Sequence, residues 1–408
     1  MTTWDSLYAN RAARMRASEI RELLKLLDKP DVISFAGGIP DPKLFPADAF
    51  KEAYASILGS NEAERALQYG VSEGSPRLRS WIMDHMKSLG VPCSEDNILI
   101  TSGSQQGLDY IGKLFLSAGD TALVQWPTYL GAIQAFNSYE PSFDRLDPGA
   151  NREASDYQLR ASEAGGSVKF AYLSPDFANP TGQSLTLDER QRILALANEL
   201  SCAVIEDAPY QSMRYDGDPV APVLALDCAT SGGIEKSRTL YCGSFSKSLS
   251  PGLRLGWICA AREVIARLVL IKQASDLNTP VLNQEAMAQV AETVFEAHTA
   301  NSRAVYKSRR DAMLAALENH MPAGVRWTRP EGGMFIWVEL PDGIDAADLL
   351  EKSVEAAKVA FVPGRAFHAD GTGANTMRLS FSCADHEKIE KGVSRLGRLI
   401  AETVTSKL

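Results

Sequence analysis

One lysine in this sequence lies in surroundings that favour covalent chemistry. Lys247 follows the apolar run TLYCGSF, which is typical of a buried strand, and the hydroxyl residues Ser244 and Ser246 come just before it. Arg254 lies seven residues beyond. A lysine amine forms Schiff bases with aldehydes, and hydroxyl groups together with a guanidinium suit a dianionic phosphate. The segment therefore indicates an aldehyde cofactor that carries a phosphate, with an exposed loop lysine as the alternative.

Other polar residues come at the ends of neighbouring apolar runs. Asp207 ends CAVIED, where a carboxylate can pair with the nitrogen of a pyridinium ring, and Tyr210 follows three residues later. Asn179 opens NPTG after VKFAYLS, and its amide can donate to a phenolic oxygen of the same ring, with a cis Asn179–Pro180 bond compatible with that role. A helix cap at Asp207 and an ordinary turn at NPTG are the alternatives.

A glycine-containing loop supplies a candidate phosphate site. TSGSQQ joins the strand-like run NILIT to a helical stretch, so that Ser104 and Gln105 stand at a helix N-terminus, where free amide groups attract phosphate. Tyr129, after Trp126-Pro127, follows the next apolar run. Its ring is suited to stack on a cofactor, although a core aromatic residue has the same spacing.

The elements that position these residues predict an α/β fold with a mostly parallel central sheet. Between about residues 95 and 285 the continuous apolar runs NILIT, TALVQW, VKFAYLS, CAVIED, TLYCGSF and LGWICA alternate with helical stretches, LGWICA being the expected antiparallel exception. Long helices follow, then short strands in MFIWVEL, VAFVPG and MRLSFS. We expect an N-terminal arm and helix at 1–38, a large domain at 39–285 and a smaller α+β domain at 286–408.

Composition narrows the possible partners. The 408 residues carry a formal net charge of -9, which argues against binding to a nucleic-acid backbone. No apolar stretch is long enough to span a bilayer, and the N-terminal sequence lacks the apolar core of a signal peptide, so a cytoplasmic location is expected. The six cysteines and five histidines lack metal-ligand spacing, and no metal site is expected.

Taken together, the segments resemble the class I and II aminotransferases of the pyridoxal phosphate (PLP) fold-type I superfamily. The resemblance runs over essentially the whole chain in the order TSGSQQ, WPTY, ANPTG, EDAPY, SFSKSLSPGLRLG and MRLSFS. Within that family the chain looks most like the 2-aminoadipate and kynurenine aminotransferase branch, through SEIRELLK, SFAGGIPDPKLFP and LQYGVSEGSPRLR.

The resemblance implies a role for each cofactor residue. Lys247 holds PLP as an aldimine and moves the proton, Asp207 pairs with the pyridine nitrogen, and Tyr129 stacks on the ring as a third catalytic residue. Asn179 and Tyr210 contact the phenolic oxygen. The phosphate is assigned to Ser104, Gln105, Ser244, Ser246 and Arg254, with Tyr69 from the neighbouring subunit of a homodimer whose active sites are shared.

Substrate contacts are implied in the same way. Arg378, in MRLSFS, binds the α-carboxylate as a bidentate fork, although a strand arginine facing solvent has the same sequence signature. Gly38 and Asn179 lie near that carboxylate, and Arg21 on the N-terminal helix meets a distal carboxylate of the substrate.

The implied reaction is a ping-pong transfer of an amino group. An L-amino acid of the 2-aminoadipate, branched-chain or aromatic type gives its amino group to a 2-oxo acid, expected to be 2-oxoglutarate. The same fold also hosts β-lyases, decarboxylases and acyl-CoA-dependent synthases, and a non-enzymatic effector-binding regulator domain is a further alternative. An intact NPTG and Arg378 favour transamination.

Overall fold

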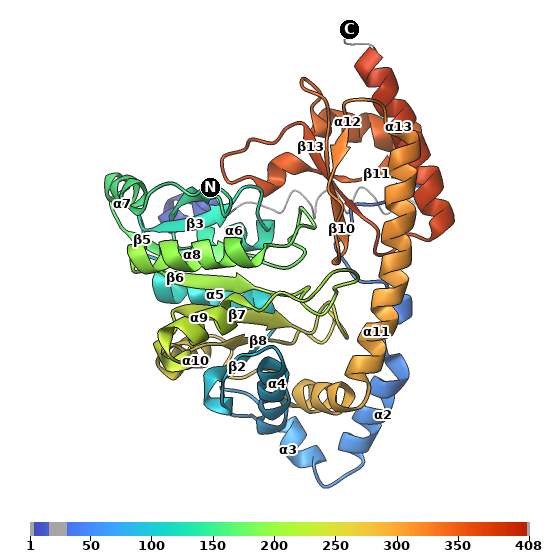
Figure 1. Ribbon diagram of the computed structural model, residues 1–408. Coiled ribbons are helices and arrows are strands. Elements are labelled where there is room, and N and C mark those ends of the chain that lie inside the picture. Colours follow the sequence, from blue (N-terminus) through green and yellow to red (C-terminus); the bar gives the residue numbers. More distant parts are fainter. Residues whose placement is uncertain (1–3, 16–30, 406–408) are drawn as a thin grey trace.

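The structure, a computed structural model, describes residues 4–15 and 31–405. The predicted N-terminal helix and Arg21 lie outside the described residues. Among those described, a large sheet, a smaller sheet and a short strand pair form the framework, joined by helices (Figure 1).

The large sheet has seven strands in the order β2-β8-β7-β6-β5-β3-β4. Its strands are β2 (Ile98–Thr101), β3 (Thr121–Gln125), β4 (Ser142–Leu146), β5 (Val168–Leu173), β6 (Ala203–Asp207), β7 (Thr239–Ser244) and β8 (Gly256–Cys259). β8 pairs antiparallel with β2 and β7, and the remaining pairs are parallel. The predicted mostly parallel sheet with one antiparallel strand from LGWICA is confirmed.

Helices cover both faces of this sheet, which explains why its strands are continuously apolar. Along β5, Phe170 and Tyr172 pack into the core beneath α5 and α10, whereas Ala171 and Leu173 pack into the core beneath α8. The helices around the large sheet are α2 (Ala47–Leu58), α3 (Ala63–Leu67), α4 (Pro76–Ser88), α5 (Ser104–Phe115), α6 (Leu130–Asn137), α7 (Ala154–Glu163), α8 (Leu187–Leu200), α9 (Val223–Ser231) and α10 (Arg262–Gln273).

The small sheet is antiparallel and has the order β12-β13-β10-β9. Its strands are β9 (Arg326–Trp327), β10 (Phe335–Glu339), β12 (Val362–Pro363) and β13 (Thr376–Ser380), and β1 (Ile33–Ser34) pairs separately with β11 (Val359–Ala360). Two helices accompany these strands, α12 (Ala346–Lys352) and α13 (His386–Thr405).

One helix connects the two parts of the chain. α11 (Val281–His320) has 40 residues, so it is roughly 60 Å long. Its first half packs through residues such as Met287 against the core around α2 and α4, and its second half packs through residues such as Met313 against the core around α13. Figure 1 shows it passing from beside α2 to α13. The predicted boundary at residue 286 lies inside this helix, and the domain division stays a prediction.

Candidate active site

The carboxyl ends of three adjacent parallel strands gather the predicted residues. Asn179 lies in the loop after β5, Asp207 is the last residue of β6, and Lys247 lies three residues beyond the end of β7. Because these strands neighbour one another in the sheet, their side chains meet at one edge. The peptide bond between Asn179 and Pro180 is cis, as the sequence suggested.

Lys247 is half-buried, and its Nζ donates a hydrogen bond to the carbonyl oxygen of Gly38 at 2.9 Å. Burial, helped by the positive charges of Arg378 and Arg254, lowers the pKa of Lys247 to about 8, while the negative charge of Asp207 opposes the shift. Near neutral pH a larger fraction of this amine is therefore uncharged than in an ordinary lysine, and the uncharged form is the nucleophile.

Asp207 is buried, with 3% of its surface exposed. Its Oδ2 accepts a hydrogen bond from the Tyr172 hydroxyl at 2.7 Å, whereas its Oδ1 has no partner within the described chain. Burial raises the pKa of Asp207 to about 6, against the lowering effects of Tyr172 and Lys247. A buried carboxylate oxygen without a partner is costly, so Oδ1 is suited to a cationic donor that the protein does not supply.

Arg378 is buried on β13, which excludes the solvent-facing alternative. Its Nη1 donates to Oδ1 of Asn179 at 2.7 Å and its Nη2 donates to the Ala36 carbonyl at 2.8 Å, and Nε has no partner among the residues described. The guanidinium lies between the rings of Phe335 and Phe367, 4.3 and 5.1 Å from their centroids. Burial lowers the pKa of Arg378 to about 10.

Gly38 leaves open the space beside this guanidinium. A Cβ built on Gly38 would lie 3.5 Å from Nη2 of Arg378 and 3.3 Å from the Phe335 ring. A side chain here would therefore lie against Arg378, whereas glycine leaves that place free.

Asn179 and Tyr210 lie close to the lysine and the arginine. Since Oδ1 of Asn179 accepts from Arg378, its NH2 group is left to donate. Tyr210 is buried with its ring 5.9 Å from Nζ of Lys247, and burial raises the pKa of its hydroxyl far above the usual range. Its hydroxyl therefore stays protonated and can donate.

The predicted phosphate residues come together at the start of α5. A Cβ on Gly103, whose φ is +84°, would clash with the guanidinium of Arg254, and a Cβ on Gly256 would lie 2.7 Å from the amide nitrogen of Ser104. The Ser244 hydroxyl accepts from the amide of Ser246 at 3.1 Å. A cation, hydroxyl groups and the N-terminus of a 12-residue helix thus converge, which suits a phosphate dianion.

Tyr129 and Gln105 form a second wall near this helix end. The Tyr129 hydroxyl lies 3.4 Å from Oε1 of Gln105, and Nε2 of Gln105 donates to the Gly131 carbonyl at 2.7 Å. Gly131 lies so close to the Tyr129 ring that a Cβ there would clash with it. The half-buried ring is therefore held in place.

Tyr69 is not brought into the site of its own chain by any contact in the structure. Its side chain is 79% exposed, and Leu67 and Val71 on either side of it are also exposed. Its proposed role from a neighbouring subunit, and that of Arg21 outside the described residues, stay predictions.

The sequence analysis missed several supporting residues. Tyr172 lies one strand away from Asp207, and Phe335 and Phe367 enclose Arg378. Tyr172 had a usable signal, because a hydroxyl in the continuous apolar run VKFAYLS needs a buried partner. The two phenylalanines had none, since a phenylalanine in an apolar strand is ordinary core.

Two further features bear on partners. Among residues 4–15 and 31–405 there is no group of three or more His, Cys, Asp or Glu side chains that could hold a metal ion. None of the helices described is long and apolar enough to cross a membrane.

Comparison with known proteins gives long matches. The family model described as aminotransferase class I and II matches residues 30–396. The aromatic-amino-acid aminotransferase 1 of Thermococcus litoralis is 44% identical over 405 residues, which cover 98% of this chain and 95% of that protein.

Two solved structures share the fold along their full length. The kynurenine aminotransferase of Pyrococcus horikoshii, in complex with PMP, superposes with a TM-score of 0.90 at 43% identity and covers 99% of each chain. The α-aminoadipate aminotransferase LysN of Thermus thermophilus, complexed with N-(5'-phosphopyridoxyl)-L-leucine, has a TM-score of 0.87 at 39% identity, with 99% of this chain and 100% of that chain covered.

Proposed function

We propose a reaction for this chain from one premise: it belongs to the class I and II aminotransferase family, and its cofactor is pyridoxal 5'-phosphate. The residues of the candidate site fit that cofactor. The N-terminus of α5 with Arg254 suits the phosphate, the unpartnered Oδ1 of Asp207 suits the protonated ring nitrogen, and the amide of Asn179 with Tyr210 suits the phenolic oxygen. When bound, PLP accepts an amino group and withdraws electrons from the substrate Cα.

The chain's own residues supply proton transfer and orientation. Nζ of Lys247, with its lowered pKa, removes the proton from the substrate Cα. Asp207, ionised by a cationic partner, keeps the proton on the ring nitrogen. Arg378 binds the α-carboxylate, and the rings of Phe335 and Phe367 exclude water from that ion pair, which strengthens it.

The substrates we propose are an L-amino acid of the 2-aminoadipate, aromatic or branched-chain type and a 2-oxo acid, with 2-oxoglutarate as acceptor. The names of the T. litoralis, P. horikoshii and T. thermophilus proteins support the aromatic, kynurenine and aminoadipate classes. The amino acid and the oxo acid use the same Arg378 in turn, in a ping-pong sequence.

We also propose a homodimer in which Tyr69 completes the phosphate site of the partner. The exposed apolar residues Leu67 and Val71 beside Tyr69 support a contact surface here.

The observation that carries the proposal is the buried Oδ1 of Asp207, which faces no donor in the described chain at the same sheet edge as Lys247. The test is an absorbance spectrum of the PLP-loaded protein before and after addition of single amino acids without any oxo acid. True donors should bleach the visible band of the bound cofactor in the first half-reaction. Lys247→Ala should slow that conversion about 10³-fold, and Lys113→Ala, at an exposed position on α5, should leave it unchanged.

Two results would contradict the proposal. If added PLP gives no visible band, the site does not hold the cofactor in the proposed way. If the band forms and no amino acid bleaches it, a lyase, decarboxylase or effector-binding role replaces transamination.

A further inference from the structure

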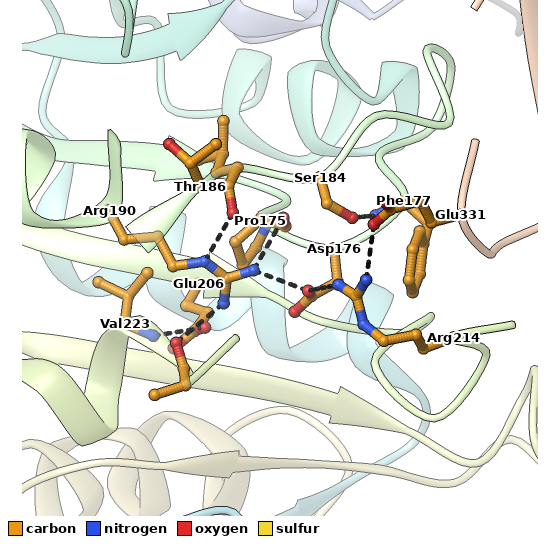
Figure 2. Close-up of polar contacts among 12 residues, drawn as sticks. Pro175, Asp176, Phe177, Ser184, Thr186, Arg190, Glu206, Arg214, Val223 and Glu331 are labelled. Atoms are coloured by element: carbon orange, nitrogen blue, oxygen red, sulfur yellow. Dashed lines mark hydrogen bonds and ion pairs between the residues drawn. The ribbon is translucent and has the colours of Figure 1, made fainter. Parts of the chain in front are cut away.

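A buried arginine closes the base of the loop that carries Asn179. Arg190 on α8 is fully buried, and its Nε donates to the Leu185 carbonyl while its Nη2 donates to the Pro175 carbonyl, both at 3.2 Å. The Leu185 amide in turn donates to the Pro175 carbonyl at 2.8 Å. Both ends of the loop between residues 175 and 185 therefore meet at one guanidinium. Figure 2 shows the bonds of Arg190 to Pro175 and Asp176.

The local sequence explains why this arginine is held so firmly. Thr186 caps α8 with a capping box, in which its hydroxyl accepts from the Glu189 amide at 3.3 Å and Glu189 accepts from the Thr186 amide at 2.8 Å. The cap thus follows Leu185 directly, and the helix begins at Leu187, about one turn before Arg190. The buried residues Ile193 and Leu194 fix the same helix against the sheet.

A carboxylate of the loop also binds Arg190. Asp176 is 4% exposed, and its Oδ1 accepts from Nη2 of Arg190 at 2.7 Å and lies 3.6 Å from Nη2 of Arg214. Arg214 stacks over the ring of Phe177, 4.8 Å from its centroid, and its Nη1 binds Oε2 of Glu331 at 2.9 Å. The loop is therefore tied through Asp176 to the segment that leads into β10.

The same guanidinium also contacts the segment that precedes α9. Nη1 of Arg190 donates to the Ala221 carbonyl at 3.0 Å, just before α9. Both oxygens of Glu206, the neighbour of Asp207, accept from the first amides of α9 at 2.8 Å. Glu206 therefore points away from the site, because consecutive residues of a strand face opposite sides. Burial raises the pKa of Glu206 to about 7, and the charge of Arg190 is among the effects that oppose the shift.

Bonds within the loop carry this fixation to Asn179. The Phe177 amide donates to the Ser184 hydroxyl at 3.2 Å, and the Ala178 amide donates to the Gln183 carbonyl at 2.9 Å. Asn179 is the next residue along the chain. These hydrogen bonds therefore fix the backbone that leads into Asn179 as long as the base of the loop stays closed.

We propose that Arg190 and Asp176 are positioning residues that hold the Asn179 amide at the phenolic oxygen of the cofactor. The inference rests on the proposed function, because that function gives Asn179 its partner. Arg190 and Asp176 form no hydrogen bond or ion pair with Lys247, Asp207 or Arg378, so the effect is transmitted through the loop backbone.

Lysine cannot replace Arg190 in this role. Arg190 donates its four hydrogen bonds from three nitrogens of a planar guanidinium, whereas a lysine donates from one nitrogen. Arg190→Lys keeps the buried charge opposite Asp176 but releases part of the loop base. The substitution therefore separates geometry from charge.

The test is a pH titration of the visible absorbance of the PLP-loaded enzyme. A hydrogen bond donated to the phenolic oxygen favours its ionised form, so loss of that bond should raise the pH midpoint of the spectral change. Asn179→Ala and Arg190→Lys should each raise it, by about 0.5 to 1 pH unit for a bond of ordinary strength. Arg192→Lys is the matched control, since Arg192 lies on the same helix and, within the described chain, binds only the Pro148 carbonyl. This variant should not move the midpoint.

The double variant Asn179→Ala with Arg190→Lys shows whether one residue acts through the other. The expected midpoint equals that of Asn179→Ala alone, because the amide that Arg190 positions is already gone. Additive shifts would overturn the inference and mean that Arg190 acts by another route.

The remaining outcomes distinguish this inference from the proposed function. If Asn179→Ala does not move the midpoint, the proposed role of Asn179 is wrong. If Asn179→Ala moves it but neither Arg190→Lys nor Asp176→Asn does, the positioning role is wrong and the proposed function stands. Asp176→Asn keeps an oxygen toward Arg190 and so carries the test should Arg190→Lys not fold, with a smaller rise in midpoint expected.

Discussion

Two of the buried arginines, Arg190 and Arg378, are held in opposite ways. Arg190 uses Nε, Nη1 and Nη2 in four hydrogen bonds to three carbonyls and Asp176. Arg378 leaves Nε without a partner in the described chain, lies between two aromatic rings and has a lowered pKa. Arg190 is bound wholly within the protein, whereas we propose that Arg378 also binds a substrate.

The same contrast holds for Asp176 and Asp207, two of the buried aspartates. The charge of Asp176 faces Arg190 at 2.7 Å, whereas Asp207 keeps Oδ1 unpartnered and has a raised pKa. A buried polar group that forms hydrogen bonds within the protein stabilises the folded state. A buried polar group without such bonds lowers that stability, and its bonding capacity is available to a ligand. Substitutions at the two sites should therefore affect different measurements.

The largest expected effect is that of Asp207→Asn on catalysis. An amide cannot hold the ring nitrogen protonated, so the first half-reaction should slow about 10³-fold, as measured by rapid-mixing absorbance. Urea unfolding of the apoprotein should change by less than about 1 kcal/mol, because the substitution breaks no ion pair. A large loss of stability would show that Asp207, like Asp176, stabilises the folded protein, and it would contradict the contrast between the two aspartates.

Arg190→Met should show the reverse pattern. It leaves Asp176 buried without its closest cation, and the free energy of unfolding should fall by about 3 to 5 kcal/mol, seen as a lower urea midpoint. Arg192→Met, on the same helix, should cost less than about 1 kcal/mol. If the two variants lower the free energy of unfolding equally, Arg190 contributes no more to stability than Arg192 does.

Arg378→Lys tests the proposed binding of the substrate carboxylate. A lysine cannot bind a carboxylate as a fork, so KM for the amino acid should rise about 30-fold with a smaller change in kcat. Arg365→Lys is the control, because Arg365 forms an exposed pair with Asp345 at 2.7 Å. A fall in kcat without a rise in KM would argue against binding of the α-carboxylate.

The last prediction concerns pH. The pKa of Lys247 is about 8 in the folded apoprotein, against an ordinary value of 10.5, so stability should be lost as the pH falls from 10.5 to 8. Below pH 8 the folded protein carries the whole cost of the buried charge. Lys247→Met should remove that slope in urea unfolding measured across the window, and a slope that persists would assign it to another group.

Much of the site was predictable because its residues end strands. Asp207, Asn179 and Lys247 follow continuous apolar runs, and parallel strands deliver their carboxyl ends to one edge. Tyr172 could have been added from its place in such a run. β4 was missed because it is an edge strand whose sequence, SFDRL, is largely polar and partly exposed.

Arg190 was beyond sequence reasoning for a physical reason. In LDERQRILALANEL it has the pattern of a charged residue on the exposed face of an amphipathic helix. Its partners are backbone carbonyls of Pro175, Leu185 and Ala221, which have no side-chain signature. Only the folded chain shows that these carbonyls converge on one point.

Helix α11 has a thermodynamic consequence of its own. Its first half contributes Met287 and Phe295 to the core near α2, and its second half contributes Tyr306 and Met313 to the core around α13. If either core unfolds, the half of α11 that packs on it becomes exposed to solvent. An isolated half of a helix has little stability by itself. The heat capacity of the protein should therefore show one sharp endotherm on warming, with a van't Hoff enthalpy close to the calorimetric value.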